Sequence, residues 1–339
     1  MTLPSALPIV QAPMAGGPST PELAAAVAAA GGYPGIAAGY LTPAALHDAL
    51  RRTRALTGAP LGVNLFCAGP DHADADAIAR YAAGLAGESA RLAVPLGAPR
   101  WDDDQVAEKV EVVANSQAHL AGFTFGCPAP GTVERLQRAG VLVAVTVTSA
   151  EEAATATDAG ADALIVQGTE AGGHQAVFDS ATPNRTPLLD ALAAVRGATT
   201  LPLIAAGGIA TGAELAAVLA AGAVAGQIGT ALLLAPEAGT SLPHRAALET
   251  ARYAGTTLTR AFSGRWARGL ANRFALEHED APDGYPQIHH LTRPLRAAAT
   301  AAGDSDVPNL WAGTNWRLAE ARPAGEIVRR LADDARRLG

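Results

Sequence analysis

The sequence contains few cysteines, few charged residues and few aromatic residues. Of its 339 residues, 2 are cysteines, 17% are charged and 4% are aromatic. Cys67 and Cys127 form no CxxC pair, which argues against a structural zinc site and fits a reducing compartment. There is no run rich in Lys or Arg, and the formal net charge is −7. We therefore expect no binding to nucleic acid or to an anionic membrane surface.

Long apolar runs and targeting signals are also missing. Gly, Pro or a charged residue interrupts each apolar run well before the length of a membrane span. The N-terminus lacks the basic segment and apolar core of a signal peptide, so a cytoplasmic location is the default expectation. Hydrophobic residues make up 49% of the chain, enough for a large core. The length suits one large α/β barrel or two medium domains, and no oligomeric state is predicted.

Short apolar segments alternate with helix-like segments over the first two-thirds of the chain. The predicted strands are residues 8–12, 35–38, 61–66, 121–125, 141–147, 163–167, 203–206 and 223–228. Helix starts are marked by a Ser or Thr cap followed by Pro or an acid, as at Thr20-Pro21-Glu22 and Thr42-Pro43. A doubly wound sheet would alternate similarly, but eight strands favour a (β/α)₈ TIM barrel.

The alternation ends after Pro236, which suggests a division into three parts. Residues 1–236 are predicted to form the barrel and to carry the ligand-binding strand ends described below. Residues 237–306 lack the alternation, and we expect a mostly helical lid insertion over the barrel mouth. Residues 307–339 are predicted to pack back on the barrel and to end in an amphipathic helix.

A glycine pair and a histidine follow the sixth predicted strand. The stretch reads IVQGTEAGGH and contains Gln167, Glu170, Gly172, Gly173 and His174. Glycines let backbone approach a ligand closely, and imidazole is the nearby side chain that titrates near neutrality. We expect His174 to be the catalytic acid/base group and Glu170 to orient the loop. The alternative is a glycine-rich turn with a solvated histidine.

The last two predicted strands also end in glycine. Gly207-Gly208 follows one strand, and Gln227-Ile228-Gly229-Thr230 closes the other. In barrels, the loops after these strands often bind phosphate through backbone N–H groups and a helix N-terminus. The alternative is that these glycines are ordinary turns. The sequence has neither the GxGxxG pattern nor a Walker motif, so a Rossmann site or a P-loop is not supported.

Two amide side chains, Asn64 and Gln167, lie near barrel strand ends, as does Met14. Amides both donate and accept, which suits the pyrimidine edge of a flavin, although either amide could instead satisfy local backbone. Together with a phosphate site, they suggest FMN as cofactor. Among the other histidines, His47, His72, His119 and His244 are expected at the surface, whereas His289 and His290 could reach the barrel mouth from the lid.

Taken together, these motifs resemble those of the nitronate monooxygenases, formerly called 2-nitropropane dioxygenases. The matching motifs are QAPMAGG (11–17), GVNLF (62–66), FTFGCP (123–128), VQGTEAGGH (166–174), AAGGIATG (205–212), QIGTALL (227–233), TRAFSGRWARGLANRF (259–274) and WAG (311–313). Their order and spacing extend along almost the whole chain.

The resemblance implies an FMN-dependent oxidation of alkyl nitronates by O₂ to a carbonyl compound and nitrite. It implies flavin contacts at Met14, Asn64, Gln167, Gly172, Gly173, Gly207, Gly208, Gln227, Ile228, Gly229 and Thr230. It also implies that His174 is the active-site histidine, acting as a base on a neutral nitroalkane or as a hydrogen-bond donor to a nitronate.

The chain departs from the family pattern at a few positions. Thr124 stands where some members have a second histidine, Gln175 follows His174, and Thr314-Asn315 replaces a more usual Gln-Gly. We expect these differences to affect substrate preference more than cofactor binding. Two alternatives remain open. One is an NADH-dependent, flavin-containing enoyl-acyl-carrier-protein reductase, whose family has an acid in place of Gln167. The other is a barrel that binds a phosphorylated ligand without redox chemistry.

Overall fold

The computed structural model describes residues 3–250 and 252–338, and it places parallel strands in a nearly closed barrel. The strands are β1 (Ile9–Gln11), β2 (Gly35–Ala37), β3 (Gly62–Phe66), β4 (Leu120–Thr124), β5 (Leu142–Val147), β6 (Ala163–Gln167), β8 (Leu203–Ala206) and β9 (Ala225–Ile228). Their order is β1-β9-β8-β6-β5-β4-β3-β2. A parallel bridge between Val10 and Tyr33 joins the two ends of the sheet. The predicted (β/α)₈ TIM barrel is confirmed.

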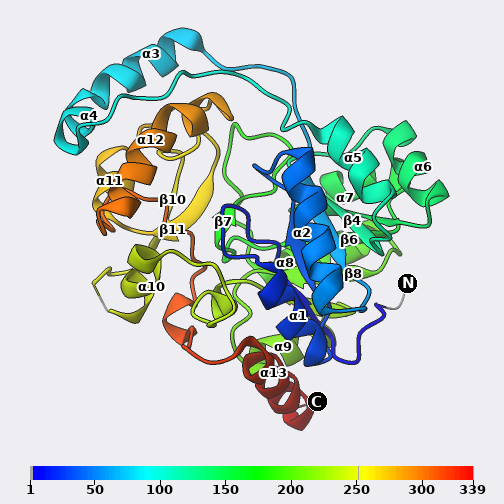
Figure 1. The fold of residues 1–339 in the computed structure, drawn as a ribbon. Coiled ribbons are helices and arrows are strands. Elements are labelled where there is room, and N and C mark those ends of the chain that lie inside the picture. Colours follow the sequence, from blue (N-terminus) through cyan, green and yellow to red (C-terminus); the bar gives the residue numbers. More distant parts are fainter. Residues whose placement is uncertain (1–2, 251, 339) are drawn as a thin grey trace.

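Helices between the strands cover the outside of the barrel (Figure 1). They are α1 (Pro21–Ala29), α2 (Pro43–Leu56), α5 (Val106–Ala114), α6 (Pro130–Arg138), α7 (Ala150–Asp158), α8 (Leu188–Ala198) and α9 (Gly212–Ala220). The side chains of Thr20, Thr42, Ser149 and Thr211 accept hydrogen bonds from the first helical turns. Such caps satisfy N–H groups that have no partner inside the helix, so the sequence signals for helix starts are confirmed.

Side chains fill the interior of the barrel. Val10, Tyr33, Leu120, Ile165 and Ile204 belong to one buried cluster inside the ring of strands. A barrel of this size is a packed core and not a pore, so ligands have room only beyond the strand ends.

The lid has two origins in the chain. Its helices are α3 (Ala75–Gly84) and α4 (Ala86–Leu92) from between β3 and β4, and α10 (Leu242–Glu249), α11 (Arg273–Glu277) and α12 (Gln287–Ala301) from the predicted insertion. In Figure 1, α3 and α4 lie beside α12 at one end of the molecule, and both helices contact α12. Phe262, Phe274, Ile288 and Leu295 form the lid core together with Tyr81.

The lid also contains a small antiparallel sheet that the sequence did not predict. Strand β11 (Ala267–Leu270) pairs with β10 (Thr256–Thr259) on one side and with β7 (Gly173–His174) on the other. Because β7 belongs to the loop after β6, this sheet joins the lid to the barrel at the predicted catalytic loop.

The C-terminal residues return to the barrel. The 3₁₀ helix η2 (Trp316–Leu318) precedes α13 (Ala324–Leu338) here, whereas the 3₁₀ helix η1 (Thr230–Leu232) directly follows β9. Helix α13 packs against α9 and α1 and buries Ile327, Val328 and Leu331. A Cβ at Gly212 of α9 would collide with Asp334, so glycine permits the close approach of these two helices.

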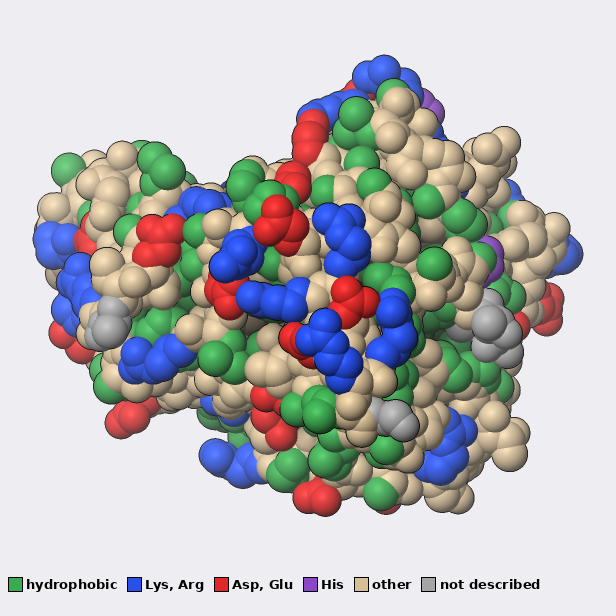
Figure 2. All heavy atoms as spheres, turned by 90° about the horizontal axis from the view of Figure 1, so that it is seen from below, with side chains coloured by type: hydrophobic (Ala, Val, Ile, Leu, Met, Phe, Trp, Pro, Cys, Tyr) green, Lys and Arg blue, Asp and Glu red, His purple; other side chains and the backbone are tan. Residues whose placement is uncertain are grey.

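Charged side chains of both signs are mixed over the face shown in Figure 2. The described residues include several exposed ion pairs, such as Arg330 with Glu320 at 2.8 Å. Exposed pairs of this kind contribute little to stability. In the described residues, no helix is both long and apolar enough to cross a bilayer.

Candidate active site

A cavity of about 390 Å³ lies at the carboxyl ends of the strands, under the lid. It is lined by nearly all of the predicted site residues: Met14, Asn64, Gln167, Gly172, Gly173, His174, Gly207, Gly208, Gln227, Gly229 and Thr230. Ile228 differs, because its side chain is buried in the core between strands and helices. The fold therefore brings together side chains and loops from widely separated parts of the sequence, at the end of the barrel where active sites form.

Backbone pairing fixes the position of His174. Opposite His174 on strand β11 is Ala267, and the next amide, Gln175 N, donates to Trp266 O at 2.8 Å. Gln167 Nε2 donates to His174 O at 3.1 Å, and Gln167 Oε1 accepts from Ala176 N at 2.8 Å. Gln167 thus satisfies local backbone, as the sequence alternative allowed, while it also lines the cavity.

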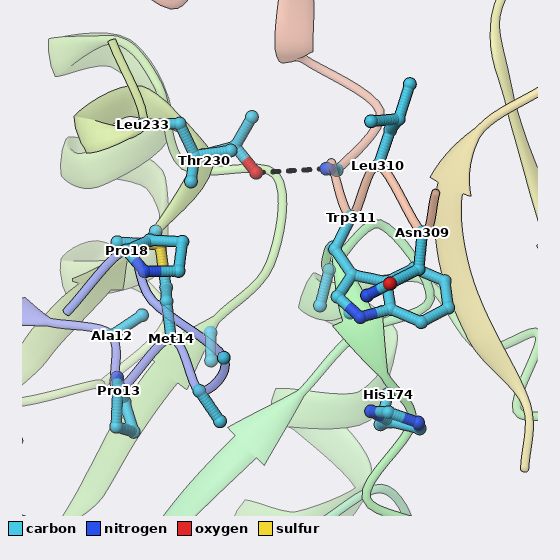
Figure 3. A pocket seen from close by; sticks show the side chains of 18 of the residues that line it. Ala12, Pro13, Met14, Pro18, His174, Thr230, Leu233, Asn309, Leu310 and Trp311 are labelled. Carbon is cyan, nitrogen blue, oxygen red and sulfur yellow. Dashed lines mark hydrogen bonds between the residues drawn. The ribbon is translucent and has the colours of Figure 1, made fainter. Parts of the chain in front are cut away.

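The imidazole of His174 lies among aromatic rings. Its ring centroid is 5.3 Å from that of Trp311, 5.6 Å from Phe125 and 5.9 Å from Tyr285. Nε2 lies 2.8 Å from Ser263 Oγ, whereas Nδ1 has no hydrogen-bond partner in the described residues. In Figure 3 His174 lies below Trp311, facing the same space. Nδ1 is therefore the ring nitrogen left for an occupant, and the half-buried imidazole lies at the cavity.

Burial keeps this imidazole neutral. It lowers the pKa of His174 to about 3, and the positive charges of Arg265 and Arg296 act in the same direction. A neutral imidazole can accept a proton at one nitrogen while the other nitrogen donates a hydrogen bond. The Ser263 hydroxyl fits either arrangement, since it can accept from Nε2–H or donate to a bare Nε2. At neutral pH the group is therefore a base or an N–H donor, not an imidazolium.

The late glycine loops present backbone N–H groups to the cavity. Gly207 and Gly208 have φ angles of +115° and +69°, which favour glycine. The N–H groups of Gly208, Ile209 and Thr230 form no hydrogen bond within the described residues. Free amides on a loop of this kind can bind an anion such as a phosphate monoester.

The N-terminus of α9 is less open than the sequence suggested. The Glu214 carboxylate accepts from Ala210 N and Thr211 N, both at 2.8 Å. A carboxylate of the chain itself thus occupies the positive end of this helix. An anion in the cavity would be bound by the loop amides and not by the first turn of α9.

The Trp311 segment closes the cavity on the side of the glycine loops. Gly313 N donates to Thr230 Oγ1 at 3.0 Å, as Figure 3 shows. Thr314 N donates to Glu170 O at 3.0 Å. Asn315 Nδ2 donates to Gly208 O at 2.7 Å. Two of the unusual residues of this sequence thus bind the C-terminal segment to the loops after β6 and β8.

The remaining predicted residues near the loop hold it in shape. The Glu170 carboxylate accepts from Leu188 N at 3.1 Å, in agreement with a loop-orienting role. Gln175 is buried and exchanges hydrogen bonds with the backbone of Asn184. Thr124 Oγ1 donates to Asn64 Oδ1 at 3.1 Å. The Asn64 Nδ2 group has no partner in the described residues and remains a donor for a ligand.

Sequence reasoning missed most of the lid side of the cavity. Tyr40, His244, Ser263, Arg296 and Asn309 also line it. The prediction that His244 lies at the surface is wrong, since 6% of it is exposed.

His289 reaches the cavity from α12, as the sequence analysis allowed. Its ring stacks on Tyr40, with ring centroids 4.3 Å apart. The sequence does carry a signal for the lid side of the cavity. His289, Thr292 and Arg296 are spaced as one polar stripe on a helix whose other buried residues are mainly apolar.

Comparison with known proteins identifies the family. The family model described as nitronate monooxygenase matches residues 2–334. The chain belongs to the nitronate monooxygenase family. A nitronate monooxygenase from Pseudomonas aeruginosa (strain PAO1) is 39% identical, with 97% of this chain and 96% of that protein covered. A probable nitronate monooxygenase from Staphylococcus aureus (strain MSSA476) is 34% identical, with 95% and 92% covered.

Solved structures agree with this assignment. The nitroalkane oxidase from Streptomyces ansochromogenes is 47% identical, with a TM-score of 0.96 and coverage of 98% of this chain and 97% of that one. FabK from Thermotoga maritima is more distant, at 26% identity and a TM-score of 0.78, with 99% and 94% covered. The prediction of an enzyme of the nitronate monooxygenase family is confirmed. Oxidation of nitroalkanes or nitronates is the activity that the family and these relatives support.

Proposed function

We propose that this protein uses FMN and O₂ to oxidise alkyl nitronates to carbonyl compounds and nitrite. Two nitronate anions and one O₂ give two carbonyl compounds and two nitrite ions, so the overall reaction balances. The observation that carries the proposal is the neutral His174 imidazole, with Nδ1 available to a cavity whose described lining contains no Asp or Glu. An acid-free cavity suits both a phosphate monoester and an anionic substrate.

The donors around the cavity fit FMN. The loop amides at Gly208, Ile209 and Thr230 are suited to the phosphate, and the free Asn64 Nδ2 group to a carbonyl of the ring. When bound, FMN supplies a two-electron acceptor that O₂ can reoxidise. FAD would need further space for a second nucleotide, for which the sequence offers no GxGxxG site.

His174 has two roles that depend on the substrate. With a neutral nitroalkane, the unprotonated ring nitrogen removes the α-proton and leaves the nitronate. With a preformed nitronate, an imidazole N–H donates a hydrogen bond to the anion. Ser263 holds Nε2 in both cases and so fixes which nitrogen faces the substrate.

Aromatic side chains from the barrel, the lid and the C-terminal segment exclude water from the reacting atoms. Tyr285, Phe125 and Trp311 surround the imidazole with apolar surface. Electrostatic and hydrogen-bond interactions in such an enclosed site are stronger than in water. The substrate therefore meets a fixed base or donor that is surrounded by aromatic rings.

The test is oxygen consumption by the purified protein with ethyl nitronate, run beside NADH oxidation with an enoyl thioester. We expect nitronate-dependent O₂ uptake, nitrite formation and no enoyl-dependent NADH oxidation. Acid release of the chromophore should give FMN. Enoyl-dependent NADH oxidation would favour the reductase alternative, and a colourless protein without flavin would favour the non-redox barrel.

A further inference from the structure

The segment between β6 and α8, residues 168–187, contains the glycine pair and His174 and has little regular structure besides β7. Its backbone carbonyls therefore need hydrogen-bond partners from elsewhere in the molecule. Three arginines of the lid supply some of them. The pairs are Arg260 with Ser180 O and Ala181 O, Arg265 with Val177 O, and Arg268 with Thr169 O. The lid thus holds this segment through long cationic side chains that donate to backbone oxygens.

Arg268 differs from the other two arginines in how its guanidinium is used. Nε donates to Thr169 O at 2.8 Å and Nη2 to Thr169 Oγ1 at 3.3 Å, so one edge of the guanidinium binds a single residue. Nη1 donates to Thr256 Oγ1 of β10 at 3.1 Å. The other two arginines reach the segment through Nη2 alone. The half-buried Arg268 side chain therefore connects the lid sheet to the first residues after β6.

The backbone of Arg268 lies beside the predicted catalytic residue. Arg268 is opposite Gly173 in the pairing of β11 with β7, and the preceding residue of β11 is opposite His174. From there the side chain reaches Thr169, so a single residue of the lid contacts both ends of the turn 169–173. In the described part of the chain, no other lid side chain forms a hydrogen bond with residues 169–173.

The turn 169–173 determines where His174 lies relative to the barrel. His174 follows Gly173 directly. Its ring is held from the lid by Ser263, and its carbonyl is held from the barrel by Gln167. If the turn could move against β11, these two contacts could no longer both be kept, and the imidazole would shift relative to the barrel wall of the cavity.

We propose that Arg268 is a positioning residue for proton removal by His174. Its guanidinium fixes strand β11 against the turn that begins at Thr169, and it thereby fixes the imidazole relative to the barrel. This inference rests on the proposed function, because it assigns the removal of the proton to His174. A lysine at this position would carry the charge but could not bind two oxygens of one residue with a planar fork.

The first test is steady-state oxygen uptake with nitroethane, expressed per bound flavin. In Arg268→Gln we expect kcat to fall by about 10- to 100-fold, because a misplacement of about 1 Å at the reacting group can cost about 100-fold. Arg268 does not line the cavity, so KM should change by less than about threefold. Arg268→Lys should give an intermediate kcat. Wild-type kcat in Arg268→Lys would show that the charge matters and the fork does not.

A matched control separates the fork from the charge of the segment. Arg185 is an exposed cation between β6 and α8 whose charge acts on Arg268. Arg185→Gln should leave kcat and KM for nitroethane unchanged. A loss in Arg185→Gln equal to that in Arg268→Gln would make the effect one of local charge and would overturn the proposal.

A double variant tests whether Arg268 acts through His174. The loss caused by a positioning residue disappears once the group that it positions is removed, so the two substitutions should not be additive. In a His174→Ala background, Arg268→Gln should lower kcat/KM for nitroethane by less than about twofold. A further loss as large as that in the wild-type background would overturn the proposal, because Arg268 would then act on another part of the site.

A milder variant covers the case in which Arg268→Gln folds poorly, which thermal unfolding would show. Thr256→Val keeps Arg268 and its charge but removes the partner of Nη1 on β10. We expect kcat for nitroethane to fall by about two- to tenfold, the range for one hydrogen bond. This loss too should vanish in the His174→Ala background. An unchanged kcat in Thr256→Val would contradict a role for the fork as a connection between the lid sheet and the turn.

Hydrogen exchange separates this inference from the proposed function, because it requires no turnover. In the flavin-containing protein, Ala171 N donates to Gly168 O, and Gln175 N donates to Trp266 O. In Arg268→Gln, amides of residues 169–176 should exchange at least about tenfold faster, whereas those of β8 should not change. If neither nitroethane nor ethyl nitronate is oxidised but this exchange is accelerated, the proposed function fails and Arg268 still positions the turn. Unchanged exchange at 169–176 would overturn the inference, whatever the kinetics.

Discussion

The two walls of the cavity differ in the groups that they present, because one offers mainly backbone and the other mainly side chains. The barrel wall consists of strand ends and glycine loops, such as Gly207-Gly208 and Gly229-Thr230, and offers mainly backbone N–H groups. The lid wall consists of side chains from α12, the β10–β11 turn and the Trp311 segment, with aromatic rings, histidines and one arginine. Backbone donors suit a cofactor that is always the same, whereas side chains can change with the substrate. We therefore propose that the barrel wall binds the cofactor and that the lid wall selects the substrate.

His174 is where the two walls meet. It follows β6 of the barrel through Gln167, but its backbone is paired with β11 of the lid, and its ring is held by Ser263. A change at His174 should therefore affect turnover and leave flavin binding intact, whereas changes deeper in either wall should affect one property more than the other.

The largest effect is expected from His174→Ala. Loss of the acid/base group should lower kcat/KM for a neutral nitroalkane by at least about 100-fold, the usual contribution of such a group. The flavin content of the purified variant should equal that of the wild type. The measurement is steady-state oxygen uptake with nitroethane, together with the flavin-to-protein absorbance ratio. His47→Ala, an exposed histidine on α2, is the control and should change neither quantity. Wild-type rates in His174→Ala would remove His174 from the mechanism.

The next largest effect is expected on the barrel wall, from Gly172→Ala. A Cβ at Gly172 would lie 2.5 Å from Gly313 N and 2.6 Å from Ala312 C, so two backbone segments must move apart. Such overpacking costs about 1–3 kcal/mol, which corresponds to roughly 5- to 150-fold weaker FMN binding if the strain falls on the cofactor site. Flavin retention after gel filtration measures this. Gly197→Ala, in α8 with open space around the new Cβ, is the control and should keep all its flavin. Full flavin retention in Gly172→Ala would contradict the role given to this wall.

A smaller effect is expected on the lid side, from Ser263→Ala. The variant leaves His174 Nε2 without its partner at 2.8 Å, so the ring loses part of its orientation. We expect kcat/KM for a neutral nitroalkane to fall by about tenfold, the value of one hydrogen bond in an enclosed site. Flavin content should stay unchanged. A loss of flavin with normal turnover per bound flavin would assign Ser263 to the cofactor and not to His174.

The last prediction concerns the free energy of unfolding at acid pH, which depends on the buried histidines. No effect is expected at neutral pH. Burial lowers the pKa of His244 to about 4, while the unfolded chain titrates near the ordinary value of 6.5. Below pH 6.5 the unfolded state therefore binds more protons, and folding stability falls as the pH drops towards 4. One such group contributes about 1.4 kcal/mol for each pH unit in this window.

His244→Gln should therefore reduce the difference between the unfolding free energies at pH 7.5 and pH 5. Urea unfolding at the two pH values measures it. Because His174 and His289 also have lowered pKa values, the variant should keep a residual acid sensitivity. An unchanged pH dependence in His244→Gln would show that the His244 imidazole is not shielded from water.

The barrel wall could be predicted from the sequence because its determinants are local. Each strand is a short apolar run, each helix start carries its own cap, and Gly207 and Gly208 follow the strand that positions them. Parallel strands in a barrel all end on the same side, so residues such as Asn64 and Gln167 could be brought to one site without knowing any long-range contact.

The lid wall could not be predicted in the same way, because its contacts join distant residues. Ser263 meets His174 across 89 positions, and the β7–β11 pairing has no sequence signal of its own, since β7 is two residues long. His244 looked like a surface residue on a short helix, and only tertiary packing buries it. At the N-terminus of α9, Glu214, whose carboxylate forms a capping box with Thr211, was not identified from the sequence.

The most direct test of the account is a crystal structure of the flavin-containing protein. We predict the flavin phosphate against the amides of Gly208, Ile209 and Thr230, and the ring between Asn64 and His174. A flavin phosphate bound on the lid side, or His174 turned away from the flavin ring, would contradict the division between the two walls.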